Sequence, residues 1–248
     1  MSADGIPRGG AFPTTAVSQV LAIRSADPAV RAAALRVLAF AYLGPVYKYT
    51  RLRWKKSEDE ARDLTQEFFA VALEHGTFGA YQPEQARFRT FLRVCLDRFI
   101  QNRIREANAQ KRGGGADLAS VDFDALEREL ARSPLEAPPS AEDYFHQEWT
   151  RALVSSSIAA LRAELESKHK LVHFHVFERI DLCEDPSQVP SYAELGAAIG
   201  LSVTDVTNRL SFARRAFRRH VLLRLRELTA SEAEYREEAR AVLGVDPD

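Results

Sequence analysis

The sequence predicts an all-α fold built from two small helical domains that a flexible acidic linker joins. Three observations support this prediction. Leu, Ala, Arg and Glu dominate the composition, which favours helices. Apolar residues recur at three- and four-residue spacing over long stretches, and no stretch of any length alternates apolar and polar residues as a strand does. Hydrophobic residues make up 46% of the 248-residue chain, which is enough to bury a core.

The first half of the chain carries clear helix boundaries. In order, we expect a disordered terminus (1–15), a helical stretch (15–50), a helix (57–74), a loop (77–86) and a long helix (87–110) that glycines 113–115 stop. Asp27 caps a helix that starts at Pro28. Ser57 and Glu60 form a capping box, and Gly76 ends the second helix.

The second half begins with a segment rich in Gly, Pro and acidic residues. In order, we expect a flexible linker (113–145), with a transient helix around the weakly apolar residues 121–130 as an open alternative, then helices from 144 to 182, a loop (183–190), a short helix from 191, a turn (200–202), a long basic helix to 228 and an acidic tail (229–248). The linker separates one module over residues 16–112 from another over residues 146–228.

Charge is distributed in blocks, although the formal net charge is only −1. Residues 85–112 carry eight basic side chains against two acidic ones, and residues 203–226 carry seven against one. Residues 116–148 are acidic instead. Two basic blocks on either side of an acidic segment indicate two DNA-contacting modules on a repelling linker. The alternative is that both blocks are ordinary solvated helix faces.

The segment over residues 190–219 has the pattern of a helix-turn-helix. Ser191 and Glu194 form a capping box, Gly200 supplies a left-handed turn residue, and Ser202 with Asp205 predicts a second box. On the second helix one stripe is apolar and the opposite face is polar, as in a helix that reads the major groove. The polar face holds Thr204, Asn208, Ser211 and Arg215, and Arg209, Arg214 and Arg218 flank it where phosphates would lie. Phe212 fits neither face, and an amphipathic hairpin with a charged solvent face is the alternative.

Basic residues are interleaved with aromatic residues in the predicted long helix from Arg87. Arg93, Asp97, Gln101 and Arg105 follow a four-residue spacing, so we expect them to form one exposed polar stripe. Arginines beside aromatic rings suit single-stranded nucleic acid, which stacks on the rings. We expect Phe91 and Phe99 to lie in the core, whereas Phe88, at the helix start, is open to either role.

Two motifs together resemble a known family. Residues 61–69 (ARDLTQEFF) and 87–92 (RFRTFL) resemble the conserved region 2 of sigma-70 family factors, and residues 191–219 resemble their region 4. The absence of a long domain between them resembles the extracytoplasmic-function (ECF) branch. Residues 109–115 (AQKRGGG) resemble a subgroup found beside serine/threonine kinases.

The resemblance implies a transcription initiation factor, not an enzyme, that brings core RNA polymerase to promoters. It implies contacts to the β′ clamp helices and the β subunit, and a linker that runs towards the RNA exit channel. The implied polymerase-binding residues are Asp63, Leu64, Gln66, Glu67 and Phe68. Those implied for the melted minus-10 element are Phe88, Arg89, Arg93, Gln101, Asn102 and Arg105. Those implied for the minus-35 duplex are Thr204, Asn208, Arg209, Ser211, Arg214 and Arg215.

The chain departs from the family pattern at three positions. Arg62 stands where members carry an acid, Asn102 where they carry Asp, and Thr207 where they carry a basic residue. We hypothesise that phosphorylation of Ser57 or Thr65 by a Ser/Thr kinase restores the negative charge near Arg62. A separate anti-sigma protein is the other expected regulator.

Two rival functions remain. A helix-turn-helix regulator that acts without polymerase would leave residues 61–69 unexplained. A metal site is not expected, because His175 points away from the helical face that His169 and His173 share. We find no Gly-rich phosphate loop, nucleophile elbow or paired catalytic carboxylates, so no cofactor is expected.

The two cysteines and the N-terminus suggest a compartment. Cys95 and Cys183 lie in apolar, helix-like surroundings and do not suggest a disulfide framework. The first 15 residues lack an apolar signal core, and no apolar run approaches the ~20 residues that span a bilayer. We therefore expect a cytoplasmic protein without membrane insertion.

Overall fold

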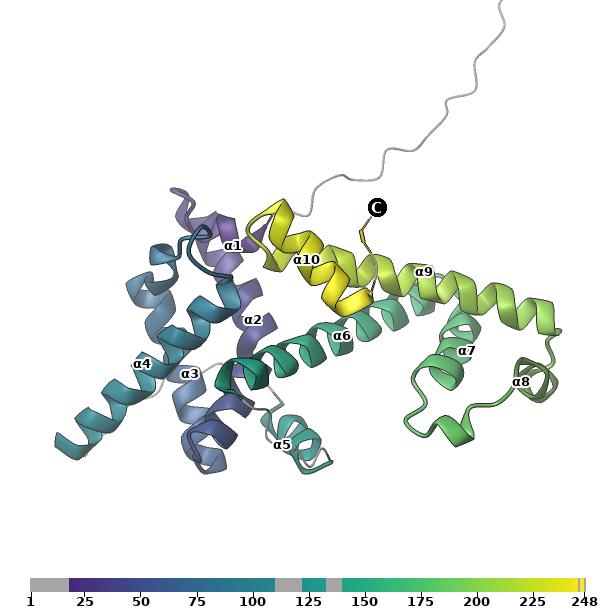
Figure 1. Cartoon of the computed structure of the whole chain (residues 1–248), viewed down its shortest axis with the longest axis horizontal. Helices are drawn as coiled ribbons and strands as arrows, with labels where there is room; N and C mark the ends of the chain where they lie inside the picture. The colour runs from purple at the N-terminus through teal and green to yellow at the C-terminus, as the bar shows by residue number, and fades with distance from the viewer. Residues whose placement is uncertain (1–17, 110–121, 133–139, 245, 248) are drawn as a thin grey trace, which may run out of the picture.

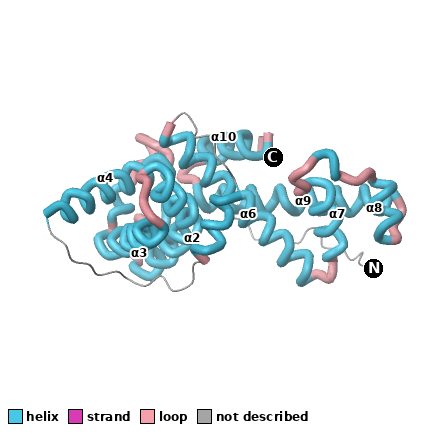
Figure 2. Tube along the Cα trace, turned by 90° about the horizontal axis from the view of Figure 1, so that it is seen from below, coloured by secondary structure: helices cyan, strands magenta, loops and turns pink. Residues whose placement is uncertain are grey.

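The computed structural model of the chain describes residues 18–109, 122–132, 140–244 and 246–247. These residues form helices joined by turns, and no strand occurs among them (Figure 1 and Figure 2). The predicted all-α class is therefore confirmed. The predicted disordered terminus and the helix stop at glycines 113–115 lie outside the described residues.

The helices follow the predicted order. They are α1 (Gln19–Ala22), α2 (Pro28–Arg53), α3 (Glu58–His75), α4 (Phe88–Ala109), α5 (Phe123–Arg132), α6 (Ala141–Ser167), α7 (Leu171–Asp181), α8 (Tyr192–Ile199), α9 (Val203–Leu228) and α10 (Glu232–Leu243), with short 3-10 turns η1 (Thr77–Ala80) and η2 (Pro186–Gln188). Within the predicted linker, the described residues form α5 and the first turn of α6. The predicted acidic tail contains α10, which the sequence pattern did not indicate.

Local capping explains where the early helices begin and end. The Asp27 side chain accepts a hydrogen bond from the Ala29 amide, with Pro28 at the first helical position. Ser57 and Glu60 form the predicted capping box, and Gly76 ends α3 in the left-handed conformation with φ of 62°. These boundaries are confirmed as predicted.

The buried side chains form two cores. The first core gathers residues of α1 to α6, the C-terminal half of α9 and α10, and includes Tyr42, Phe88, Trp149, Val221 and Ala239. The second core gathers the C-terminal half of α6, α7, α8 and the N-terminal half of α9, and includes Leu161, Phe177, Leu195 and Val206. The long helices α6 and α9 run side by side and contribute to both cores (Figure 1). The two cores are thus connected by α6 and α9, whereas the chain between α4 and α6 begins and ends at the first core.

The helix α2 passes through the middle of the first core. It is the one helix in the described part of the chain that is long and apolar enough to cross a membrane by length and composition alone. This differs from the expectation that no apolar run approaches that length. In the structure, Leu38, Tyr42 and Val46 of this helix are buried against neighbouring helices, whereas Phe40 is 79% exposed.

An aromatic cluster fixes the start of α4 in the first core. The Phe88 ring is fully buried, and its centroid lies 5.5 Å from that of Tyr42, 5.7 Å from Phe78 and 5.2 Å from Tyr81, all edge-on. Edge-to-face pairs of this kind add to the free energy gained from burial. Phe88, which the resemblance assigns to DNA, is therefore a core residue in this structure.

Truncating this ring tests that assignment. We expect Phe88→Ala to lower the free energy of unfolding by about 3–5 kcal/mol, because it leaves a cavity among three rings. Urea denaturation followed by circular dichroism measures the change. The matched control Phe40→Ala removes a ring that is already exposed and should change the free energy by less than about 0.5 kcal/mol. Equal effects of the two variants would contradict the assignment.

Candidate nucleic-acid interface

The N-terminal half of α4 is turned into the molecule. The guanidinium of Arg89 is nearly buried, pairs with the fully buried Glu238 of α10, and lies 5.0 Å from the Trp149 ring centroid. Arg87 pairs with Glu238 at 3.0 Å and also with Glu237. A buried carboxylate needs a partner charge, and these two arginines supply it to Glu238 in this conformation. Arg89 is thus engaged within the protein rather than free for DNA.

The next predicted contact, Arg93, is also paired. Its guanidinium lies 2.8 Å from the Asp97 carboxylate, one turn along α4, and 3.9 Å from Glu142 of α6. Asp97 in turn accepts hydrogen bonds from the Tyr49 hydroxyl at 2.9 Å and the Trp54 indole at 3.1 Å. This network holds α4 against α2. The inner half of the predicted minus-10 surface is therefore used for packing.

The C-terminal half of α4 differs, because it projects beyond the rest of the molecule (Figure 1). Arg98, Gln101, Asn102 and Arg105 are exposed, and none has a hydrogen-bond or ion-pair partner among the described residues. Their spacing of three and four residues places them on one stripe. We call these four residues the outer face of α4. Arg98 belongs to it although the resemblance did not assign it a role, and its place in the basic block was the available signal.

The helix α3 presents few of the residues that the resemblance assigns to polymerase. Asp63 is exposed, and Leu64 and Gln66 are half-buried. Glu67 pairs with Arg103 of α4 at 2.7 Å. The Phe68 ring is buried and packs on the rings of Phe69, Phe78 and Phe99. The aromatic position is therefore internal, and the exposed part of this surface centres on Asp63.

The predicted phosphorylation sites on α3 differ in access. Ser57 is the exposed cap residue of the helix, and its hydroxyl accepts the Glu60 amide. Thr65 is fully buried, so a kinase does not reach its hydroxyl in this conformation. Arg62, the charge reversal, lies 3.0 Å from Glu58 and 3.2 Å from Asp124 of α5. The reversed charge thus has acidic partners within the chain.

The helices α8 and α9 form the predicted helix-turn-helix. Ser191 and Glu194 make a complete capping box at the start of α8, and Gly200 ends it with φ of 71°. Ser202 accepts the Asp205 amide, but the Asp205 carboxylate accepts from the Ser202 hydroxyl at 2.7 Å. The second capping box is therefore only half formed, which corrects the prediction.

A glycine that the pattern did not single out sets the distance between the two helices. A Cβ atom on Gly196 would lie 2.6 Å from the carbonyl oxygen of Leu201, closer than such atoms approach. The Leu201 amide donates to the Gly196 carbonyl at 2.8 Å, so the turn closes directly on this residue. Close approach of two backbones is the reason for glycine here.

The polar side of α9 is exposed where α8 meets it. Thr204, Asn208 and Arg215 are exposed and Ser211 is half-buried, and none has a partner in the described part of the chain. We call these four residues the recognition face. On the opposite side Val206, Leu210 and Ala213 are buried in the second core, as the stripe predicted. The recognition face and the outer face of α4 lie towards opposite ends of the molecule (Figure 1 and Figure 2).

All three predicted phosphate contacts beside the recognition face are occupied internally. Arg218 donates a hydrogen bond to the Asp246 carbonyl oxygen at 2.6 Å. Arg214 makes a two-pronged pair with Asp181 of α7, at 2.8 and 2.6 Å. Arg209 pairs with Asp205 at 3.2 Å. Arg214 therefore fixes α9 on α7 in this conformation.

Phe212, which fitted neither face of the predicted helix, packs edge-on against His173. The centroids of the two rings lie 5.2 Å apart.

One carboxylate anchors α9 on α6. Glu164 accepts hydrogen bonds from Lys168 at 2.6 Å and from the Arg219 guanidinium at 2.5 Å, and it contacts the His220 ring at 2.6 Å. Partial burial works against its charged form, but these hydrogen bonds outweigh it and lower the pKa of Glu164 to about 2. This cluster fixes the position of the helix that carries the recognition face.

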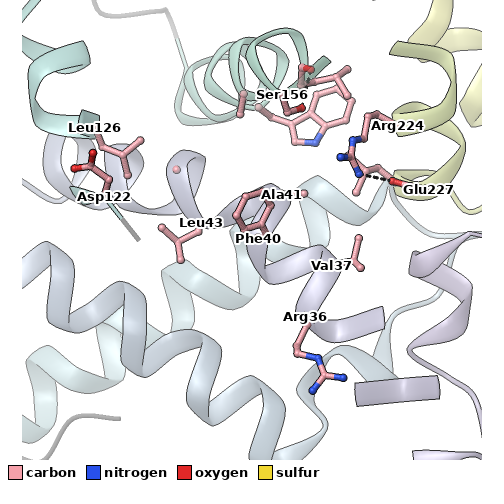
Figure 3. A pocket seen from close by; sticks show the side chains of 15 residues that line it. Arg36, Val37, Phe40, Ala41, Leu43, Asp122, Leu126, Ser156, Arg224 and Glu227 are labelled. Carbon is pink, nitrogen blue, oxygen red and sulfur yellow. Dashed lines mark hydrogen bonds and ion pairs between the residues drawn. The ribbon is translucent and has the colours of Figure 1, made fainter. Parts of the chain in front are cut away.

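An open apolar groove of about 620 Å³ lies between α2, α5, α6 and α9 (Figure 3). Phe40 and Val37 of α2 form its floor, and Leu126 of α5 and the Arg224–Glu227 pair of α9 border it. It brings together no set of polar groups that would perform chemistry. Among the described residues, no group of three or more His, Cys, Asp or Glu could hold a metal ion.

Comparison of the chain with models of known families, with curated proteins and with solved structures gives no match.

The Glu164 cluster makes the stability depend on pH. Because the folded pKa of Glu164 is about 2 and its ordinary value is 4.5, its stabilisation is complete above about pH 4.5 and is lost as the pH falls towards 2. We expect Glu164→Gln to lower the free energy of unfolding by on the order of 1 kcal/mol or more at pH 5.5 and by little at pH 2.5. Urea denaturation at both values measures this, with the exposed Glu166→Gln as a control that should show no such convergence. A Glu164→Gln deficit that stays constant with pH would contradict the assignment.

Proposed function

We propose that this chain is a promoter-recognition subunit of bacterial RNA polymerase, of the ECF sigma type. The observation that carries the proposal is the unpartnered recognition face of α9, formed by Thr204, Asn208, Ser211 and Arg215 in a helix-turn-helix. Side chains near the N-terminus of a recognition helix contact base edges in the major groove. The free amide of Asn208 suits adenine, and Arg215 suits guanine or a phosphate.

The second part of the proposal concerns single-stranded DNA and polymerase. The outer face of α4 offers two unpaired arginines with Gln101 and Asn102 between them, which suits the backbone and base edges of a melted strand. The region 2 resemblance of residues 61–69 supports polymerase binding through the exposed Asp63. In this proposal the minus-10 contacts come from the outer face, because Phe88, Arg89 and Arg93 are engaged internally.

The proposal implies a cytoplasmic location, since core polymerase and promoter DNA are there. Regulation remains part of it. A Ser/Thr kinase acting on the exposed Ser57, or an anti-sigma protein, would control access to α3. A phosphate at the N-terminus of α3 would be favoured by the helix dipole.

Binding to core polymerase tests the first claim. We expect the purified chain to bind bacterial core polymerase, and Asp63→Lys to weaken binding at least about tenfold, since it reverses a charge at the interface. Fluorescence anisotropy of the labelled chain measures the affinity. The matched control Glu74→Lys reverses an exposed acid at the far end of the same helix and should bind as the wild type does. Absence of wild-type binding would contradict the sigma proposal.

Selection of DNA tests the second claim. With core polymerase present, we expect selection from random duplexes to yield one preferred element, and Asn208→Ala to relax the preference at one base pair, at a cost of about 1–3 kcal/mol. Gln147→Ala, an exposed polar change on α6, should leave the selected sequence unchanged. If the chain alone selects the same duplex and ignores polymerase, the regulator function replaces the sigma function.

A further inference from the structure

The acidic helix α5 is bound to a basic and aromatic surface made by two other helices. We call this surface the α5 seat: it consists of Tyr47, Lys48 and Arg51 of α2 and Arg62 of α3. The facing residues of α5 are Phe123, Asp124, Glu127 and Glu129. Every acid of this set meets a basic partner, so the charge pattern of the two surfaces is complementary.

Glu127 is the best-held of these acids. Its carboxylate accepts hydrogen bonds from Arg51 at 2.6 Å and 3.0 Å and from the Tyr47 hydroxyl at 2.6 Å. The Arg51 hydrogen bonds lower the pKa of Glu127 below its ordinary value. A planar guanidinium that grips a carboxylate with two nitrogens selects for geometry as well as charge. Arg51 and Glu127 therefore define the register of α5 on its seat.

Apolar contacts complete the fit. Phe123 is 5% exposed, and its ring lies edge-on to Tyr47 at 5.0 Å. The Arg62 guanidinium lies 5.1 Å from the same ring centroid while it pairs with Asp124. Leu126 of α5 lies over Gly44 of α2, where a Cβ atom would lie 3.4 Å from its Cδ2, about an ordinary van der Waals distance. The surface thus accepts one aromatic ring and one leucine between three basic groups.

Docking and helix formation of α5 depend on each other. The helix has 10 residues, fewer than the ~12–15 at which an isolated helix in water becomes even marginally stable. Two of its ion pairs are largely solvent-exposed on the acidic side, with Asp124 74% and Glu129 48% exposed. Exposed pairs of this kind hold weakly. Release of α5 thus breaks exposed ion pairs and uncovers Phe123 of the first core, whereas the second core contains no residue of α5.

The seat also adjoins the surface proposed to bind polymerase. Arg62 lies directly before Asp63 and one turn before Gln66 on α3. A partner that lies along this part of α3 meets α5 and its acidic side chains. Arg62, which stands where the resembled family carries an acid, then has a structural role, because it binds Asp124 and Phe123 of α5.

We propose that the α5 seat is a binding site for a short acidic amphipathic helix, that α5 is its occupant in the free chain, and that α5 competes with the partner that docks on α3. The last clause rests on the proposed function. The first two concern the chain alone, so they are tested without polymerase.

The first experiment measures binding of α5 in trans. The probe is a fluorescent peptide with the sequence of residues 119–134, and the receptor is the full chain carrying Phe123→Ser and Glu127→Ala, which vacates the seat and leaves no charge at position 127. We expect this receptor to bind the peptide at least about tenfold more tightly than the wild type, whose own α5 occupies the seat. Equal or absent binding to both chains would overturn the proposal.

A charge exchange shows whether the peptide uses the seat. Adding Arg51→Glu to the vacated receptor should abolish binding of the wild-type peptide. A peptide that carries Glu127→Arg should then bind this receptor again, because the pair is restored in reverse. Failure of the exchanged pair, with circular dichroism showing folded receptors, would overturn the assignment of the seat.

The second experiment tests competition. The vacated chain should bind core polymerase at least about fivefold more tightly than the wild type does, and added peptide should reduce that affinity. Equal affinities would overturn the competition while leaving the seat intact. If neither chain binds polymerase but the peptide results hold, the proposed function fails, and with it the competition, and the seat remains.

Discussion

The side-by-side packing of α6 and α9 is the contact on which the rest of the structure depends. Trp149 and Leu153 of α6 lie in the first core with Val221 and Leu225 of α9, and further along the same two helices Leu161 and Val206 lie in the second core. Glu164, on the stretch of α6 that belongs to the second core, binds Arg219 and His220 of α9 and so fixes the two helices to each other. Since interiors are close-packed and transmit strain, a shift of α9 in one core moves it in the other. The distance between the recognition face and the outer face of α4 is thus set by these two helices.

The pair of arginines at the start of α4 shows how packing divides a basic block. Arg87 and Arg89 bind Glu238, a carboxylate that the first core buries, whereas Arg98 and Arg105 on the same helix have no partner among the described residues. A charge that is desolvated with its counterion is costly to separate, and a charge in water is not. Any ligand that binds the arginines of the outer part therefore separates no internal ion pair, whereas use of Arg87 and Arg89 would require α10 to move.

Local signals in the sequence were sufficient for most of the helices and for the helix-turn-helix, but not for α10 or for which side chains are exposed. Capping at Ser57 and Ser191 depends on neighbours three residues away, so it could be predicted. The burial of Arg89 depends on Glu238, 149 positions later in the chain, and nothing near Arg89 signals that partner. The same holds for α5. Its apolar side chains pack on α2, which is far away in the sequence, so the segment was predicted to be mainly a flexible linker. Glycine is needed at position 196 because the backbone of Leu201 approaches it closely. The spacing of residues in the sequence does not reveal such a contact.

The position of α2 at the centre of the first core has a consequence for synthesis of the protein. This apolar helix leaves the ribosome early. Of the helices that pack most against it, α3 follows directly, but α6 begins only at Ala141. At about 5–20 residues per second, α2 is complete for on the order of five to twenty seconds before α6 begins to be made. The apolar side that α6 later covers stays exposed during that interval, so the nascent chain is most open to aggregation then.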